Sequence, residues 1–286
     1  MKTERYNGVT RIIDIGDELD LRKTLNCGQA FRWQEIDNTG IFHGVIGNKV
    51  VFIRQGLFND KKEGIATNLD IEDIDILVNY LNLNLSYKKI FECELDLKYD
   101  AFAYKSYQYS KGIRILKQDL WEMIISFIIS QQNSIGRISK TIDKISEMYG
   151  NKITGSWFGH EITRYTFPTP EQLSKATSEE LRELGLGFRD RYIIGATNKI
   201  ITDTTFLDRV TKSNNPEYLL TELYGVGPKV ANCVTLFGLN KYDSFPIDRH
   251  IQRIISEEYD GNIGLTRFKG YAGIVQQFMF YYRLNN

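Results

Sequence analysis

Two short stretches decide how the helical part of this chain folds: Leu223-Tyr-Gly-Val-Gly-Pro-Lys-Val-Ala-Asn-Cys233 and Phe245-Pro-Ile-Asp-Arg-His250. Asn214-Asn215-Pro216 precedes the first stretch and is typical of a helix opening, because Pro is tolerated in the first turn of a helix. Gly225 and Gly227 then predict a tight hairpin whose backbone N–H groups can approach a phosphate. We therefore expect a helix-hairpin-helix at about residues 215–240, a motif that clamps DNA.

Lys229 and Asp248 lie nineteen positions apart, each at the predicted start of a helix. An amine must lose its proton before it can attack, and both the positive end of a helix and burial in a base pocket favour the neutral form. Asp248 is the predicted N-cap of a helix through Ile254, with one carboxylate oxygen bound to backbone N–H groups and the other free. A free carboxylate oxygen can stabilise a developing sugar cation.

Each of these two residues alone is more often a surface Lys or a structural cap. Together with the hairpin and the spacing, they favour catalysis. The hypothesis is that Lys229 attacks C1′ of a nucleotide flipped out of the duplex. The resulting Schiff base could then lose the 3′ phosphate by β-elimination.

Length and composition limit the class of protein. The 286 residues, 42% of them apolar, suffice for two domains or one large globular domain. No apolar run approaches a membrane span, and the N-terminus lacks the apolar core of a secretory signal, so we expect a cytoplasmic protein. Cys27, Cys93 and Cys233 are too scattered for a disulfide framework, a zinc site or an iron–sulfur cluster, which predicts three free thiols and no metal ligands.

The charge is unevenly distributed although the formal net charge is zero. Residues 1–100 hold 13 Lys and Arg against 17 Asp and Glu, and residues 101–286 hold 23 against 19. A neutral protein is a weak candidate for nucleic-acid binding, since a basic balance is the usual footprint. Any DNA-binding face should therefore be a local patch in the C-terminal two-thirds of the chain.

The periodicity of apolar residues changes along the chain. Ile41–Ile46 and Lys49–Ile53 flank Gly47-Asn48 and predict a β-hairpin, whereas Ile71–Leu83 is more helical. From Asp119 onward the spacing is helical, and we expect the remainder to be a helical bundle. The predicted fold class is α+β, with an N-terminal antiparallel β-sheet domain (1–110) followed by a helical domain (111–286) that contains the helix-hairpin-helix.

Four ordered segments give the chain a wider resemblance. They are Cys27-Gly-Gln-Ala-Phe-Arg-Trp33, Ser130-Gln-Gln-Asn-Ser-Ile-Gly-Arg137, Gly185-Leu-Gly-Phe-Arg-Asp-Arg-Tyr192 and the hairpin with its Asp. With these segments the chain resembles, over nearly its whole length, the 8-oxoguanine DNA glycosylase/lyase family of the helix-hairpin-helix, Gly/Pro-Asp superfamily. The resemblance implies that Lys229 is the nucleophile, that Asp248 assists it, and that the activity belongs to base excision repair.

The resemblance also implies a pocket for the damaged base. The Gly28 carbonyl would accept a hydrogen bond from N7–H, which oxidised guanine has and guanine lacks. With guanine, two acceptors would face each other, at a cost of roughly 1–3 kcal/mol. Gln276 would read the Watson–Crick edge, Phe280 would stack on the base, and Cys233 would form the opposite wall. Without the resemblance, Gly28 would be a turn glycine, Phe280 and Cys233 core residues, and Gln276 a solvated residue.

On the opposite strand, the resemblance assigns Gln132, Arg137 and Arg189 to the surroundings of the orphan cytosine. Gln132 stands where the family usually has Asn, and Phe188 stands where it has a Tyr that wedges into the duplex. Gly225, Gly227 and His250 would contact DNA phosphates, although His250 could equally be a plain surface histidine.

Three rival functions are less well supported. Endonuclease III-like relatives usually carry a four-cysteine cluster, which three scattered cysteines cannot build. Glycosylases for alkylated bases generally lack the hairpin Lys. A non-catalytic DNA-binding protein would use the hairpin only as a phosphate clamp, and the presence of both Lys229 and Asp248 argues against it.

The expected partner is double-stranded DNA with 8-oxoguanine opposite cytosine, bound by a monomer. No cofactor is required, although the family's hairpin often holds a monovalent or calcium ion through backbone carbonyls. The high Asn, Ile and Lys content indicates A·T-rich coding and a bacterial source, which would make the location nucleoid-associated.

Overall fold

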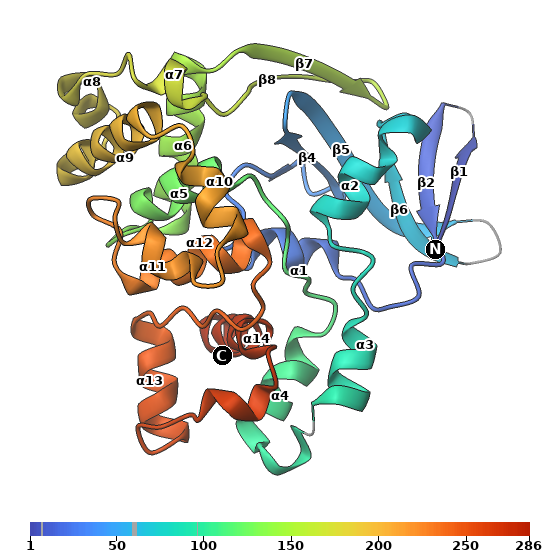
Figure 1. Cartoon of the computed structure of the whole chain (residues 1–286). Helices are drawn as coiled ribbons and strands as arrows, with labels where there is room; N and C mark the ends of the chain where they lie inside the picture. The colour runs from blue at the N-terminus through green and yellow to red at the C-terminus, as the bar shows by residue number, and fades with distance from the viewer. Residues whose placement is uncertain (7, 59–61, 96) are drawn as a thin grey trace. The chain divides into compact units, whose positions relative to one another are not determined.

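The computed structural model describes residues 1–6, 8–58, 62–95 and 97–286 (Figure 1). The strands are β1 (Lys2–Tyr6), β2 (Val9–Ile13), β3 (Gln34–Glu35), β4 (Ile41–Ile46), β5 (Lys49–Phe58), β6 (Lys62–Thr67), β7 (Lys152–Trp157) and β8 (His160–Tyr165). The α-helices are α1 (Leu21–Asn26), α2 (Ile74–Tyr80), α3 (Tyr87–Lys89), α4 (Ala101–Ser110), α5 (Leu120–Ile129), α6 (Ile135–Tyr149), α7 (Pro170–Leu173), α8 (Ser178–Glu183), α9 (Asp190–Thr202), α10 (Phe206–Lys212), α11 (Pro216–Leu220), α12 (Pro228–Leu239), α13 (Arg249–Glu258) and α14 (Ala272–Asn285).

Six strands form one sheet in the order β1-β2-β6-β5-β4-β3, and β7 pairs with β8 in a second sheet. The pairings described for the large sheet, β1 with β2, β2 with β6, β3 with β4 and β5 with β6, are all antiparallel. The predicted α+β class, an N-terminal antiparallel sheet followed by helices, is confirmed.

The chain divides into two compact units, and each combines distant parts of the sequence. Unit 1 contains residues 1–30, 53–117 and 240–286, and unit 2 contains residues 31–52 and 118–239. The strand β5 runs from unit 2 into unit 1. The sequence predicted a domain boundary near residue 110. Because each compact unit combines residues from both sides of it, that boundary stays a prediction.

In unit 1, helix α14 packs along α4. Phe278 of α14 stacks on Phe91 with 5.1 Å between ring centroids, and Phe91 stacks on Tyr107 at 4.2 Å. Arg114 is fully buried here, donates to the Asn82 carbonyl at 2.7 Å and also binds the carbonyls of Leu81 and Leu85. The stacked rings hold Phe91 and α4 against the C-terminal helix, and Arg114 ties the segment after α4 to residues 81–85.

In unit 2, helix α12 packs on α5, whose residues are almost all buried. The Phe127 and Phe237 rings stack at 5.5 Å, and Asp119 caps α5 by accepting from the Glu122 N–H at 2.8 Å. The helical spacing expected after Asp119 is confirmed in α6, where Ile138, Ile142 and Ile145 are buried, whereas Ile135 of the same repeat is exposed.

The predicted hairpin around Gly47-Asn48 is confirmed as β4 and β5, and Gly47 has a φ of 59°. Ile71–Leu83 is helical over most of its length, and Thr177 and Glu180 form a capping box at the start of α8. Cys27 and Cys233 are free, whereas the side chain of Cys93 lies outside the described residues.

The prediction that everything after Asp119 is helical was wrong for residues 152–165, which form the β7–β8 hairpin. Its turn residues Phe158 and Gly159 both have positive φ, 48° and 79°, as hairpin turns of two residues require. A Phe at such a position gives no turn signal in a sequence. Gly155 of β7 lies against Val50, so a methyl group there would come within 2.7 Å of the Val50 Cβ.

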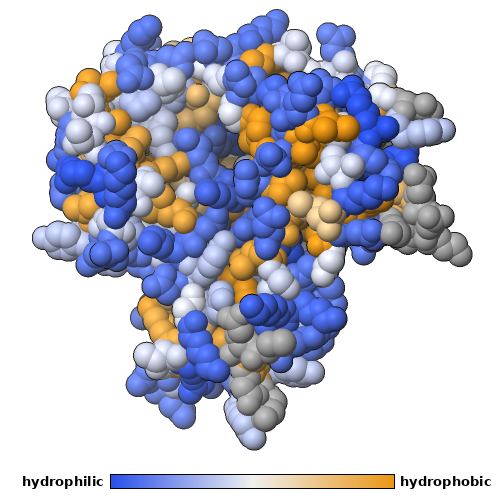
Figure 2. Space-filling view, turned by 45° about the vertical axis from the view of Figure 1, so that its right-hand side comes forward, coloured by the Kyte–Doolittle hydropathy of each residue, from blue (hydrophilic) through white to orange (hydrophobic). Residues whose placement is uncertain are grey.

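Across the described segments, none of the helices combines the length and the apolar character that crossing a bilayer demands. Figure 2 shows that on one face of the molecule hydrophobic residues reach the surface in patches among hydrophilic ones. Several of the exposed hydrophobic side chains are aromatic, including Tyr99, Tyr218, Tyr224 and Phe188.

Candidate functional site

The hairpin between α11 and α12 depends on its two glycines for different reasons. Gly225 has a φ of 84°, and a methyl group there would lie 2.3 Å from the Tyr192 ring. Gly227 is exposed, and a methyl group there would meet no atom within 4 Å. Only Gly227 therefore matches the expected open backbone for a phosphate, while Gly225 is needed for the turn and for its packing on Tyr192.

Lys229 lies in the first turn of α12 and is half-buried. Its Nζ is 5.5 Å from the centroid of the Phe127 ring on α5. Among the described residues no carboxylate forms an ion pair with this amine, so the amine is not tied up by a salt bridge. Cys233, one turn later on the same helix, is only 4% exposed.

Asp248 is the N-cap of α13, as the sequence predicted. Its Oδ1 accepts hydrogen bonds from the backbone N–H groups of His250 and Ile251, each at 2.9 Å. No hydrogen bond to Oδ2 comes from the described residues. One oxygen is thus fixed by the helix and the other is available, as expected for a residue that stabilises a cation.

Helix α14 presents Gln276 and Phe280, four residues apart on one face. Gln276 is 4% exposed, and its Oε1 is buried with no hydrogen-bond partner among the described residues. Phe280 is half-buried and meets the His250 ring edge to face, with centroids 5.8 Å apart. A buried acceptor without a donor is costly, so this amide oxygen is a natural point for a ligand to bind.

Gly28 follows α1 in a turn with a φ of 84° and is partly exposed, whereas its neighbours Cys27 and Gln29 are fully buried. Burial raises the pKa of the Cys27 thiol to about 12. This thiol stays protonated at neutral pH and does not compete as a nucleophile.

The turn after α5 is held by Arg189. Its Nε donates to the Gln131 carbonyl at 2.8 Å, and a terminal nitrogen donates to the Gln132 carbonyl at 3.2 Å. Arg189 is only 8% exposed, and its remaining terminal nitrogen donates to the Leu186 carbonyl at 3.1 Å. The sequence assigned Arg189 to DNA and gave no sign of this role, which only the tertiary structure reveals.

Gln132 is exposed and has a φ of 48°, a conformation that Asn adopts more readily than most residues. Arg137 is exposed on α6. The pKa of Arg189 is lowered mainly by burial and, second, by the positive charge of Arg137. Phe188 is 41% exposed and meets Tyr192 edge to face at 5.7 Å. Unit 2 thus offers an exposed aromatic ring whose centroid is 4.6 Å from the Arg189 guanidinium carbon, and an exposed Arg137, which suits a nucleic-acid strand.

Each unit gathers its own group of the predicted site residues. Unit 1 contains Gly28, Asp248, His250, Gln276 and Phe280. Unit 2 contains Gln132, Arg137, Phe188, Arg189, Gly225, Gly227, Lys229 and Cys233.

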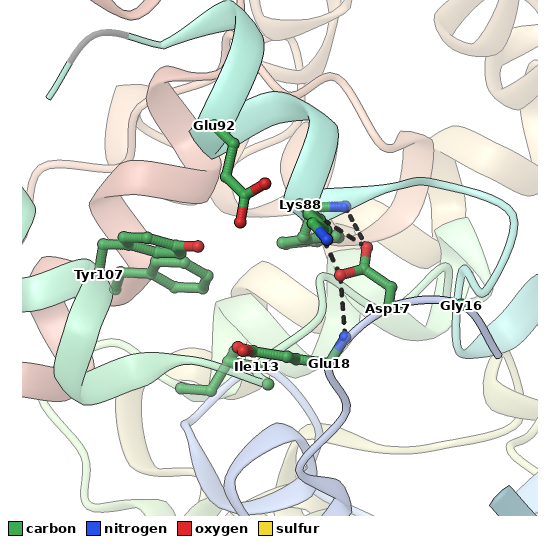
Figure 3. Close-up of a pocket in the computed structure, with 10 residues that line it drawn as sticks. Gly16, Asp17, Glu18, Lys88, Glu92, Tyr107 and Ile113 are labelled. Atoms are coloured by element: carbon green, nitrogen blue, oxygen red, sulfur yellow. Dashed lines mark hydrogen bonds between the residues drawn. The ribbon is translucent and has the colours of Figure 1, made fainter. Parts of the chain in front are cut away.

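A cavity of about 310 Å³ in unit 1 is separate from these residues (Figure 3). Its lining consists of Gly16, Asp17, Glu18, Tyr87, Lys88, Glu92, Tyr107, Gly112, Ile113 and Phe278. The Asp17 carboxylate accepts hydrogen bonds from the backbone N–H groups of Glu18, Tyr87 and Lys88, so its role here is to satisfy backbone donors (Figure 3). None of the predicted base-pocket residues lines this cavity.

The described residues contain no cluster of three or more His, Cys, Asp or Glu side chains suited to a metal. The hairpin carbonyls of Leu223 and Gly225 accept from the Val226 N–H at 3.0 Å and from the Gln131 amide at 3.1 Å. Each keeps a second lone pair, and carbonyl oxygens suit hard cations. A cation at the hairpin would be held by backbone carbonyls of this kind.

Comparison with known proteins adds two family matches. Residues 12–124 match the N-terminal domain of 8-oxoguanine DNA glycosylase, and residues 125–260 match the HhH-GPD superfamily of base excision DNA repair proteins. Together the two matches span most of the chain.

Individual relatives agree. The chain is 36% identical to a Saccharomyces cerevisiae N-glycosylase/DNA lyase over 85% of its length and 69% of that protein. It is 31% identical to an Arabidopsis thaliana N-glycosylase/DNA lyase over 83% of its length, which spans 65% of that longer protein. The Clostridium acetobutylicum 8-oxoguanine glycosylase/lyase, solved with double-stranded DNA containing cytosine opposite 8-oxoG, aligns with a TM-score of 0.89 at 30% identity, covering 100% of this chain and 98% of that one.

Proposed function

This chain belongs to the 8-oxoguanine DNA glycosylase/lyase family, and from that premise we propose how its residues divide the work of excision. The protein is a bifunctional DNA glycosylase that removes 8-oxoguanine from duplex DNA in base excision repair and cleaves the strand by β-elimination.

We assign the nucleophile to Lys229. The lone pair of its Nζ forms a bond to C1′ of the flipped nucleotide, while the C1′–N9 bond breaks and its electron pair leaves with the oxidised base. The sugar ring then opens to a Schiff base. Removal of a C2′ proton breaks the C3′–O bond, and the 3′ phosphate departs. The absence of an ion pair to Lys229 among the described residues supports this role.

Asp248 stabilises the positive charge that develops on the sugar as the base leaves. Its Oδ1 is held by two N–H groups at 2.9 Å, so the carboxylate keeps its orientation, and Oδ2 accepts no hydrogen bond from the described residues. A charge that is already held in position stabilises the transition state without a further free-energy cost for reorienting the carboxylate.

Recognition of the base is assigned to Gly28, Gln276, Phe280 and Cys233. The observation that carries this assignment is the buried, unpartnered Oε1 of Gln276. Such an oxygen can accept from the N–H groups of the Watson–Crick edge of 8-oxoguanine, while the Gly28 carbonyl accepts from N7–H. Phe280 and Cys233 would hold the two faces of the base.

The opposite strand is assigned to the surface of unit 2 around Phe188 and Arg137. Phe188 would fill the gap left by the flipped nucleotide, and Arg137 would donate to the orphan cytosine. Arg189 would act partly through the Gln131–Gln132 turn that it holds. His250 and the Gly225–Gly227 hairpin would bind phosphates.

Because the substrate is chromosomal DNA, we infer a cytoplasmic, nucleoid-associated monomer in a bacterium.

Borohydride trapping with an 8-oxoguanine:cytosine duplex tests the assignment. The wild-type protein should form a covalent adduct, and Lys229→Gln should form none while still binding the duplex. Lys212→Gln is the matched control, because Lys212 is exposed on α10 and pairs with Asp208 at 2.7 Å. Undiminished trapping by Lys229→Gln would remove its role, and binding without any adduct in the wild type would favour a non-catalytic clamp.

A further inference from the structure

A second buried glutamine of α14 contacts the turn that contains Gly28. The Nε2 of Gln277 donates to the Cys27 carbonyl at 2.7 Å, across 250 positions of sequence. Gln277 is 2% exposed and Cys27 is fully buried, so this hydrogen bond is shielded from water. It fixes the plane of the Cys27–Gly28 peptide.

On the other side of Gly28, the side chain of Gln29 is anchored in the core. The Gln29 amide donates to the Arg114 carbonyl at 2.7 Å and the Thr24 carbonyl at 3.0 Å, and its Oε1 accepts from the Leu116 N–H at 2.9 Å. Glycine alone populates many backbone conformations, so a partly exposed Gly28 needs such anchors to hold one carbonyl direction. The two glutamines provide them from both sides.

Gln276 and Gln277 are consecutive residues of one helix, and both belong to unit 1 with Gly28. Successive side chains on a helix point about 100° apart, so Gln276 can face a ligand while Gln277 faces the turn. One helix therefore contains both Gln276, assigned to the Watson–Crick edge of the base, and Gln277, which supports the turn whose Gly28 carbonyl accepts from N7–H. The distance between these two recognition points is therefore set by a helix and not by a loop.

We propose that Gln277 is a positioning residue that holds the Gly28 carbonyl in place for N7–H and thereby sets the preference for 8-oxoguanine over guanine. The proposal rests on the proposed function, in which Gly28 is the acceptor for N7–H. Gln277 itself touches no substrate. Its removal weakens recognition of the base and leaves the chemistry at Lys229 intact.

The test compares two reactions of the same protein. Gln277→Met keeps the length of the side chain and removes its donor, and we expect single-turnover excision of 8-oxoguanine opposite cytosine to fall about tenfold. Cleavage of a duplex with a preformed abasic site should change by less than about twofold, because such a site presents no base to Gly28. Gln108→Met, at an exposed position of α4, should change neither rate.

A merely structural role would lower both reactions together and reduce the thermal midpoint in parallel. If Gln277→Met is too unstable to assay, Gln277→Leu also removes the donor and places no polar group in this buried position, so it should show the same selective loss. Equal rates of excision in mutant and wild type, or equal losses in both reactions, would overturn the proposal. If the wild type itself fails to excise 8-oxoguanine, the proposed function fails instead.

Discussion

At the scale of single residues, Asp248 caps a helix, and our proposal gives the same carboxylate a chemical task. One oxygen caps α13 and the other is free for the substrate. The sequence predicted this arrangement because an N-cap depends on the residues next to it. The two tasks can be separated by substitution, since capping needs only an acceptor and charge stabilisation needs a negative charge.

Asp248→Asn should preserve the cap and remove the charge. We expect single-turnover excision to fall about 100-fold or more, as for the loss of a preorganised electrostatic group. The free energy of unfolding should change by less than about 0.5 kcal/mol, because Asn and Asp are similar N-caps. Asp248→Ala should lose both activity and stability, and an active Asp248→Asn protein would contradict the assigned role.

Arg189 and Arg137 illustrate what a sequence does not tell about a residue. Both are arginines in segments that resemble DNA-contacting segments, yet Arg189 is buried on three backbone carbonyls and Arg137 is exposed. Nothing in the local sequence distinguishes them, because the carbonyls of Gln131 and Gln132 approach Arg189 only in the tertiary structure. The Gln277–Cys27 hydrogen bond was beyond prediction for the same reason.

Substituting the two arginines should therefore have different effects. Arg189→Ala leaves three carbonyls without their donor and should destabilise the protein by about 2–4 kcal/mol in chemical denaturation. Arg137→Ala should change stability by less than about 0.5 kcal/mol. It should weaken duplex binding and reduce the slope of affinity against salt by about one. Equal stability of the two variants would contradict the conclusion that Arg189 holds the Gln131–Gln132 turn through its hydrogen bonds.

At the scale of elements, local sequence signals predicted the β4–β5 hairpin and most of the helices, but they did not lead to a prediction of the β7–β8 hairpin. The Gly47 turn and the Thr177–Glu180 capping box are readable because each uses residues typical of its geometry. The β7–β8 hairpin has weaker signals: its apolar alternation is short, with Ile153 and Trp157 less exposed than their polar neighbours, and its two-residue turn contains Gly159 but begins at Phe158.

The helix-hairpin-helix gives a prediction at this scale. Gly225→Ala should destabilise the hairpin by about 1–3 kcal/mol, since the backbone is left-handed and the methyl group would meet the Tyr192 ring. Gly227→Ala should leave the thermal midpoint nearly unchanged, because its methyl group would meet open space. Thermal unfolding of the pair measures this contrast, and two equal midpoints would show that the Tyr192 contact does not constrain the turn.

At the scale of the whole molecule, the two compact units interleave along the chain, and no composition shift marks their boundaries. The fold class could be predicted because it follows from the order of strands and helices. The assignment of residues to units could not, because it depends on which distant segments pack together. The proposed site residues are correspondingly spread over segments from Gly28 to Phe280, and most of them were proposed from the resemblance over four ordered motifs, since local patterns pointed only to the hairpin, Lys229 and Asp248.

The central claim is that the amine of Lys229 forms the covalent bond to the sugar. The most direct measurement is peptide mapping by mass spectrometry of the wild-type protein after borohydride reduction on an 8-oxoguanine:cytosine duplex and digestion of the DNA. The account predicts the sugar remnant on the peptide that contains Lys229. A remnant on the N-terminal amine or on another lysine, with the Lys229 peptide unmodified, would contradict it.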